Sequence, residues 1–338
     1  MQFGQKEEEI LTPVDGLHGH FQKKILSLNN LIIKESHSDI CLIPKVASHI
    51  FSTSGKRIRP LLTLAAAEMC GYKGGDRDVI LAACVEFVHT ATLLHDDVID
   101  NSDERRGELS AHKIWGNKTS ILVGDFLFTK LFQMLVDDGS LPILKVISKV
   151  SSDIIEGEVA QLSLKANLDA TRADYFQVVQ LKTASLFQAA AEVGAVVAGS
   201  GYEDALRCYG QNIGIAFQIV DDILDYSSSF EVLGKPIGND FQERLSTLPI
   251  IVLYEEALRN GRKEEQSVLK ECFVQGDLSA NNFKKVSSML KAHNTLGVCF
   301  DIAMGYVIKA KHSLSIFPEN FLRKTLSDLA EYTILRTR

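Results

Sequence analysis

The sequence D-D-x-x-D occurs twice, as Asp96, Asp97 and Asp100 and again as Asp221, Asp222 and Asp225. Because a helix turns about 100° per residue, positions i and i+4 share one face and i+1 lies beside them, so each motif groups its carboxylates. Such hard oxygen ligands suit Mg²⁺, which binds through a few carboxylates together with substrate phosphates. A solvated acidic helix end is the alternative for one motif, but two copies favour a metal site.

An anionic ligand bridged by metal also needs cationic partners. Basic residues with their polar neighbours occur as Gly55-Lys56-Arg57-Ile58-Arg59-Pro60, Arg105-Arg106, Lys182-Thr183 and Lys235. Any one of them is explained equally well by a solvated surface charge. Arg105 and Arg106 are the exception, because they follow the first acidic motif directly and guanidinium groups match diphosphate oxygens. His89 precedes Asp96 by seven residues, on the same helix face, although a buried histidine with purely structural contacts is the rival interpretation.

Long apolar helices must position these groups. Residues 81–100 and 204–226 contain no proline and are apolar nearly all round until their acidic ends, which predicts core helices of a bundle. Partner helices are expected at 18–34, 57–71, 119–137, 142–165, 172–198 and 246–259. Since no linker-like segment divides the chain, we expect an all-α fold, a single large helical bundle over 1–338 with a central cavity. Residues 1–17 are expected to form a loosely ordered arm.

Composition and charge exclude several classes of protein. The 338 residues are 46% hydrophobic and 23% charged, as in a globular protein, and the net charge of -7 argues against a nucleic-acid binder. The six cysteines form no C-x-x-C motif, which indicates free thiols in a reducing compartment. The N-terminus is acidic rather than leader-like, and no run of 18 uninterrupted apolar residues occurs. These features predict a cytoplasmic protein with no membrane anchor.

Several of these motifs together resemble a known family. G-K-R-x-R-P, H-T-A-T-L-L-H-D-D-V-I-D, R-R-G, G-D-F-L, G-E-V-A-Q, K-T-A-S-L, F-Q-I-V-D-D-I-L-D-Y and L-G-K are similar to the trans-polyprenyl diphosphate synthases. The long-chain octaprenyl, solanesyl and decaprenyl enzymes of quinone side-chain synthesis are the nearest, and the resemblance runs from about Lys45 to Pro249. It implies a homodimer of helical subunits that uses Mg²⁺ to condense isopentenyl diphosphate repeatedly onto an allylic diphosphate such as farnesyl diphosphate.

The resemblance also implies roles for individual residues. The Mg²⁺ ligands would be Asp96, Asp97, Asp100, Asp221, Asp222 and Asp225. Isopentenyl diphosphate would be bound by Lys56, Arg59, His89 and Arg106. The allylic diphosphate would be bound by Arg105, Lys182, Thr183, Gln218 and Lys235. Loss of the diphosphate would depend most directly on Asp96, Asp97, Asp100, Arg105, Lys182, Asp221 and Asp222, since metal ions and cations stabilise the departing anion.

Product length is expected to depend on the helix that carries Asp96. Short-chain members of the family have a bulky aromatic near Ala91 and Thr92, roughly 7 to 8 Å below Asp96 at the helical rise of about 1.5 Å per residue. Ala91 leaves that route open, which predicts a long product. Phe128, Phe132 and Leu135 are candidates for a deeper floor, with ordinary core packing as the alternative for each.

One position departs from the family pattern. Leu245 stands where the motif G-x-D-L-x-x-G-K-x-T-L-P has its lysine, and Arg244 stands at the preceding glycine. We expect a weakened but working allylic site, in which Arg244, Lys235 or Lys182 replaces the missing charge and Leu245→Lys lowers the allylic KM. The loss also raises the alternative of a subunit of a heteromeric synthase with weak or no activity alone. A terpene cyclase would have a different second metal motif, and a scaffold protein has no use for so many converging charges.

Overall fold

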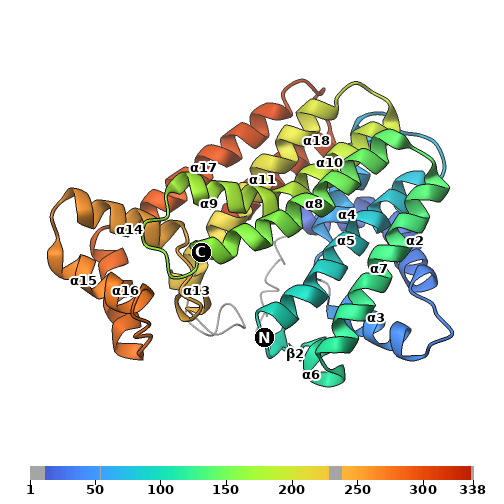
Figure 1. Ribbon diagram of the computed structural model, residues 1–338. Coiled ribbons are helices and arrows are strands. Elements are labelled where there is room, and N and C mark those ends of the chain that lie inside the picture. The colour runs from blue at the N-terminus through green and yellow to red at the C-terminus, as the bar shows by residue number, and fades with distance from the viewer. Residues whose placement is uncertain (1–11, 54, 228–237, 336–338) are drawn as a thin grey trace, which may run out of the picture.

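The structure is a computed structural model that describes residues 12–53, 55–227 and 238–335. It is an all-α bundle, which confirms the predicted fold class (Figure 1). The helices are α1 (Pro13–His20), α2 (Gln22–Glu35), α3 (Leu42–Thr53), α4 (Ile58–Met69), α5 (Arg77–Ile99), α6 (Ala111–Trp115), α7 (Asn117–Asp138), α8 (Leu141–Leu164), α9 (Arg172–Val179), the π-helical segment η1 (Gln180–Ala184), α10 (Ser185–Ala198), α11 (Glu203–Ser227), α13 (Asn239–Gln242), α14 (Leu248–Arg259), α15 (Lys263–Phe273), α16 (Ala280–Ala292), α17 (Thr295–Ser313) and α18 (Phe321–Leu335). Two short strands, β1 (Glu104–Arg105) and β2 (Glu108–Leu109), pair antiparallel.

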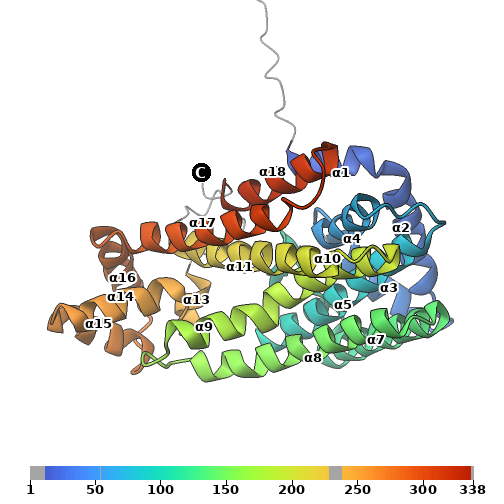
Figure 2. The same ribbon diagram turned by 90° about the horizontal axis from the view of Figure 1, so that it is seen from above.

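The two helices that carry the acidic motifs lie inside the bundle, as predicted. Helix α5 packs against α4 and α7, and α11 packs against α10 and α17 (Figure 2). Two glycines let α11 approach its neighbours closely, because a Cβ would lie 2.3 Å from the Phe187 carbonyl oxygen at Gly210 and 2.6 Å from the Ala184 Cα at Gly214. This close packing brings the second acidic motif near the segment that contains Lys182.

Some boundaries differ from those predicted. Within the arm expected over 1–17, residues 13–17 belong instead to α1, which is capped by Thr12 and buries Val14 and Leu17 against the core, while residues 1–11 lie outside the described part of the chain. The helix expected over 172–198 is interrupted by η1, and the loop after Asp100 contains the β1–β2 hairpin. The apolar periodicity of the sequence does not reveal the start of α1, the η1 segment or the β1–β2 hairpin.

A second, smaller apolar cluster lies at one end of the bundle. Phe241, Leu253 and Phe273 belong to this cluster, which α13 to α16 surround (Figure 1). Leu296 packs against both this cluster and the main core, so the apolar packing is continuous between them. The organisation of the chain as one domain stays a prediction.

Helices α5 and α7 are long and apolar enough to cross a membrane by length and composition alone. In α5, however, 72% of the apolar 18-residue stretch is buried inside the bundle, as expected for a core helix. The corresponding figure for α7 is 39%, so one face of α7 presents apolar side chains to the outside.

Candidate active site

The C-terminal end of α5 opens into a cavity of about 270 Å³. The polar side chains in its wall include Asp96, Asp100, Arg105, Gln161, Lys182, Thr183, Gln218 and Asp222. Its apolar wall is formed by Leu164, Val178, Val179 and Leu245, together with the ring of Tyr175. Thus the structure brings members of both acidic motifs and two predicted cations to one water-accessible site.

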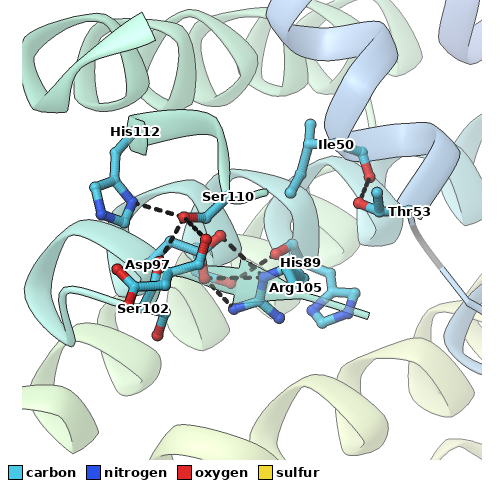
Figure 3. Close-up of polar contacts among 10 residues, drawn as sticks. Ile50, Thr53, His89, Asp97, Ser102, Arg105, Ser110 and His112 are labelled. Atoms are coloured by element: carbon cyan, nitrogen blue, oxygen red, sulfur yellow. Dashed lines mark hydrogen bonds and ion pairs between the residues drawn. The ribbon is translucent and has the colours of Figure 1, made fainter. Parts of the chain in front are cut away.

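Asp97 contacts Arg105, and its expected role as a metal ligand stays a prediction. Arg105 donates from Nε to both Asp97 carboxylate oxygens at 2.9 Å and from Nη2 to Oδ1 at 2.6 Å (Figure 3). Asp97 is buried and is not part of the cavity wall, because its i+1 position turns it about 100° from Asp96. Its role in this structure is to orient Arg105, which does line the cavity.

The hairpin that carries Arg105 is itself held in place. The Ser110 hydroxyl donates to the Asp103 carbonyl oxygen at 3.1 Å, and it also lies 3.2 Å from Nδ1 of His112 (Figure 3). Arg106 adopts a left-handed conformation with φ of 54° and directs Nη1 to the Thr53 carbonyl oxygen at 3.0 Å. The two adjacent arginines consequently serve different sites.

Lys182 and Thr183 lie in the π-helical segment η1, a distortion that often marks functional sites. Lys182 donates to Glu158 at 2.9 Å and to Gln161 at 2.6 Å. Both acceptors are on α8, which approaches η1 closely because Gly157 has no Cβ: one placed there would lie 2.5 Å from the Lys182 backbone nitrogen. Glu158 and Gln161 hold the lysine side chain beside the acidic motif of α5.

A chain of hydrogen bonds connects η1 to the second acidic motif. Thr183 donates to Gln218 at 2.8 Å, and Gln218 donates to Asp222 at 2.8 Å. On its other side, Asp222 accepts a 2.5 Å bond from the buried hydroxyl of Tyr175 on α9. Both oxygens of Asp222 are therefore oriented by neighbouring side chains.

The other carboxylates of the second motif have different surroundings. Asp225 accepts hydrogen bonds from the backbone N–H groups of Asn239 (3.1 Å) and Asp240 (3.0 Å), so it caps α13. Asp221 interacts electrostatically with Arg59 on α4, where its charge opposes the lowering of the guanidinium pKa by burial. Asp222 is thus the member of this motif that lines the cavity, whereas Asp221 and Asp225 were expected to contribute equally.

Three carboxyls at this site have raised pKa values, mainly because burial disfavours their charged form. Burial, followed by repulsion from Glu158, raises the pKa of Asp96 to about 7. Burial raises the pKa of Asp222 to about 7, although the hydrogen bonds from Tyr175 and Gln218 oppose the change. Asp100 is shifted in the same direction, again mainly by burial. A divalent cation would relieve this cost, so the donor set fits such an ion.

The carboxylates alone do not form a closed metal site. Among the described residues, no three His, Cys, Asp or Glu side chains converge on one point.

A second cluster of basic residues lies where α4 meets α5. Arg59 Nη1 lies 3.2 Å from His89 Nε2, and the Arg59 guanidinium stacks 4.3 Å from the centre of the Phe187 ring. Lys56 donates to the Tyr332 hydroxyl of α18 at 3.1 Å. The guanidinium of Arg106 occupies the space where a Cβ at Gly55 would be, only 1.9 Å from it. The structure therefore brings together Arg59, His89 and Arg106, three of the four residues predicted to bind isopentenyl diphosphate, whereas the side chain of Lys56 contacts Tyr332.

Burial and positive charge control the two central members of this cluster. Burial, together with the charges of Arg59, Arg105 and Arg106, lowers the pKa of His89 well below its usual value. His89 is therefore neutral at pH 7. Burial also lowers the pKa of Arg59 to about 10, and its buried Nε has no hydrogen-bond partner in the described part of the chain. An anion would supply the partner that Arg59 lacks.

Arg57 does not belong to this anion site. It pairs with Glu86 at 2.7 Å, with side-chain exposures of 12% for the arginine and 3% for the glutamate. Its Nη2 also donates to the Phe51 carbonyl oxygen at 3.2 Å. Arg57 stands at the N-terminus of α4 in a left-handed conformation, so the ion pair holds the turn that presents Lys56 and Arg59.

The residues predicted to control chain length are dispersed. Ala91 is completely buried in α5, and Thr92 donates back to the His89 carbonyl oxygen at 2.8 Å. Phe128 stacks on His95, whereas Phe132 is 40% exposed on α7 and Leu135 is buried. None of the five lines the cavity formed by the described residues, so their role stays a prediction.

Position 245 lies in the cavity wall, as its place in the motif suggests. The neighbouring Arg244 does not replace the expected lysine, because its guanidinium lies 3.3 Å from the position of a Cβ at Gly276, on the side of α15 and α16. Lys235, another predicted substitute, lies outside the described residues.

Sequence reasoning assigned no role to three cavity residues, Glu158, Gln161 and Tyr175. The spacing of Glu158 and Gln161 was a usable signal, because residues i and i+3 on a helix share the face that meets Lys182. Tyr175 had no such signal, since it meets Asp222 only through tertiary packing.

Comparison with known proteins agrees with this geometry. Residues 41–290 match the Polyprenyl synthetase family. The chain is 39% identical to octaprenyl diphosphate synthase of Escherichia coli (strain K12), over 92% of this chain and 95% of the relative. It is 35% identical to octaprenyl diphosphate synthase of Haemophilus influenzae, over 98% and 99% of the two chains.

Two crystal structures are similar across nearly the whole chain. A decaprenyl diphosphate synthase from Rhodobacter capsulatus has a TM-score of 0.91 and 41% identity, covering 96% of this chain and 100% of its own. A polyprenyl synthase from Caulobacter crescentus CB15, complexed with calcium and isoprenyl diphosphate, has a TM-score of 0.89 and 40% identity, covering 95% and 97%. The chain therefore belongs to the polyprenyl synthetase family and is a prenyltransferase.

Proposed function

We propose that the protein is a long-chain all-trans polyprenyl diphosphate synthase that adds isopentenyl diphosphate repeatedly to an allylic diphosphate such as farnesyl diphosphate. One observation carries the proposal: a single cavity joins Asp96 and Asp100 with Asp222, beside Lys182 and Arg105. The similarity to octaprenyl and decaprenyl diphosphate synthases supports a long product, and the natural use would be a quinone side chain.

On the allylic side, Asp96, Asp100 and Asp222 would hold Mg²⁺, which when bound stabilises the departing diphosphate electrostatically. Arg105 and Lys182 bind the diphosphate oxygens directly, since buried Asp97 already orients the arginine and half-buried Glu158 the lysine. The neighbouring apolar wall, formed by Leu164, Val178 and Val179, excludes the water that would convert an allylic cation to an alcohol.

On the other side, Lys56, Arg59 and Arg106 hold the diphosphate of isopentenyl diphosphate. Neutral His89 contributes a hydrogen bond without adding a charge that would repel the cation formed nearby. The alkene of isopentenyl diphosphate then attacks the allylic carbon, and a proton leaves the new product. The lengthened chain re-enters as the allylic substrate of the next cycle.

The assembly we propose is a homodimer in the cytoplasm without a membrane anchor. Large apolar side chains are exposed on α7 and α8 of the single chain, at Ile121, Leu122, Val136, Ile155, Val159 and Leu162. A second copy of the chain would cover this face. Analytical ultracentrifugation tests the proposal, which a monomer at micromolar concentration contradicts.

A subunit of a heteromeric synthase is the second candidate, and Leu245 in the cavity wall is the observation that favours it. The two functions separate in one experiment. Purified chain is incubated with labelled isopentenyl diphosphate, farnesyl diphosphate and Mg²⁺, and the dephosphorylated products are sized by mass spectrometry. A ladder ending at one long product supports the synthase, whereas bound diphosphate without elongation supports the subunit.

A further inference from the structure

The segment that follows α8 is locked beside Leu245. Lys165 and Leu245 form an antiparallel bridge, and the Ala166 N–H donates to the Arg244 carbonyl oxygen at 2.8 Å. The Ser246 hydroxyl also donates to the Asn167 carbonyl oxygen at 2.6 Å, which ties the two segments together. Side chains directly opposite each other in an antiparallel pair emerge on the same face, so Lys165 and Leu245 point to the same side.

That side is the mouth of the active-site cavity. A recess of about 140 Å³ adjoins the cavity and shares Asp100, Gln161 and Leu245 with it. Lys165 lines this recess together with Glu158 and Glu243, and it is the only basic residue among the described residues of its wall.

Other cations near position 245 are already engaged. Lys182 is bound by Glu158 and Gln161, and Arg244 is directed toward Gly276. Lys165, in contrast, is exposed and forms no ion pair with any residue that the structure describes. Its long side chain is free to meet an anion that enters the cavity.

We propose that Lys165 supplies the positive charge that position 245 lacks and binds the outer oxygens of the allylic diphosphate at the mouth of the cavity. The inference rests on the proposed function and deepens it, because it assigns a substrate-binding residue from a different segment of the chain. In the family motif the cation stands at position 245. In this chain it stands at Lys165, the bridge partner of Leu245, so the same face of the site still has a cation.

A double-mutant cycle tests this assignment. Lys165→Met removes the charge while keeping the length of the side chain, Leu245→Lys introduces a cation on the opposite bridge partner, and the double variant combines them. Lys145→Met, at an exposed lysine in the first turn of α8, is the matched control. KM for farnesyl diphosphate, KM for isopentenyl diphosphate and kcat are measured for each variant. The Kd for inorganic diphosphate with Mg²⁺ is measured by calorimetry.

We expect Lys165→Met to raise the allylic KM and the diphosphate Kd about tenfold, as for one lost contact between charged groups. KM for isopentenyl diphosphate and kcat should stay within about twofold, and so should every parameter of Lys145→Met. Leu245→Lys should restore the allylic KM in the Lys165→Met background, because coupled residues are not additive. In the wild-type background it should change the allylic KM little, in place of the lower KM expected from the sequence alone, because Lys165 already supplies the charge.

Other outcomes overturn the assignment. An allylic KM within about twofold of wild type in Lys165→Met refutes it, as does an equal rise of both KM values or a failure of Leu245→Lys to rescue. Failure of the proposed function is distinguishable, because the wild-type chain would then make no product. In that case the calorimetric Kd still decides whether Lys165 binds diphosphate.

Discussion

The substitution Glu86→Gln tests whether Arg57 has a structural role in the turn before α4, in contrast to Lys56 and Arg59, which we propose bind substrate. Glu86 is 3% exposed and pairs with Arg57, which is 12% exposed, so the substitution leaves a largely buried guanidinium without its counter-charge. Breaking a buried ion pair costs about 3 to 5 kcal/mol. We expect the lower end, about 3 kcal/mol, because the Gln amide oxygen still accepts a neutral hydrogen bond and the Phe51 carbonyl oxygen remains a partner.

The same substitution should affect one substrate more than the other. Arg57 anchors the turn that presents Lys56 and Arg59, whereas Arg105 and Lys182 are held by other residues. KM for isopentenyl diphosphate should therefore rise several-fold while KM for farnesyl diphosphate stays nearly unchanged.

Urea unfolding followed by circular dichroism, at one fixed protein concentration, measures the free energy of unfolding, and steady-state kinetics at 25 °C measure both KM values. Glu68→Gln is the control, since the pair of Glu68 with His20 is exposed by 39% and 34% and should contribute less than about 1 kcal/mol. A loss below about 1 kcal/mol for Glu86→Gln, or an equal change in both KM values, would refute the reasoning.

Three further predictions concern the allylic side. Tyr175→Phe removes one of the two side-chain donors to Asp222 and should weaken Mg²⁺-dependent diphosphate binding about tenfold, measured by calorimetry; unchanged binding contradicts this. Gly157→Ala places a Cβ against the Lys182 backbone and should lower kcat at least tenfold, whereas Gly305→Ala, which meets nothing within 4 Å, should not. The pKa values of Asp96 and Asp222, raised to about 7 in the folded state from 3.8, mean that the folded metal-free protein binds more protons than the unfolded chain between about pH 4 and 7. Its stability should fall as pH rises through that window, and the increase in Tm caused by Mg²⁺ with diphosphate should be larger at pH 8 than at pH 6; equal increases would count against the assignment.

Much of the fold and the site was predictable because local periodicity determines it. The apolar runs before Asp96 and Asp221 required buried helices, and α5 and α11 end at the predicted acidic motifs. The grouping of G-K-R-x-R-P with His89 was implied by the family resemblance, and Arg59, His89 and Arg106 do lie together. The boundaries of the helices were less predictable from the sequence, since η1 and the early start of α1 depend on packing rather than on composition.

The sequence by itself determined which residues lie on which face of each helix, because spacing along one helix is a local property. Tertiary structure alone decided what meets that face. It assigned Asp97 to Arg105 and left Asp96 in the cavity, it separated Arg57 from Arg59, and it placed Tyr175 against Asp222. It also brought Lys165 opposite Leu245. The neighbouring hydrogen bond between Ser246 and Asn167 joins residues 79 positions apart in the sequence. Such contacts join segments distant in sequence, and their partners are selected by the packing of whole helices, which no spacing within one segment encodes.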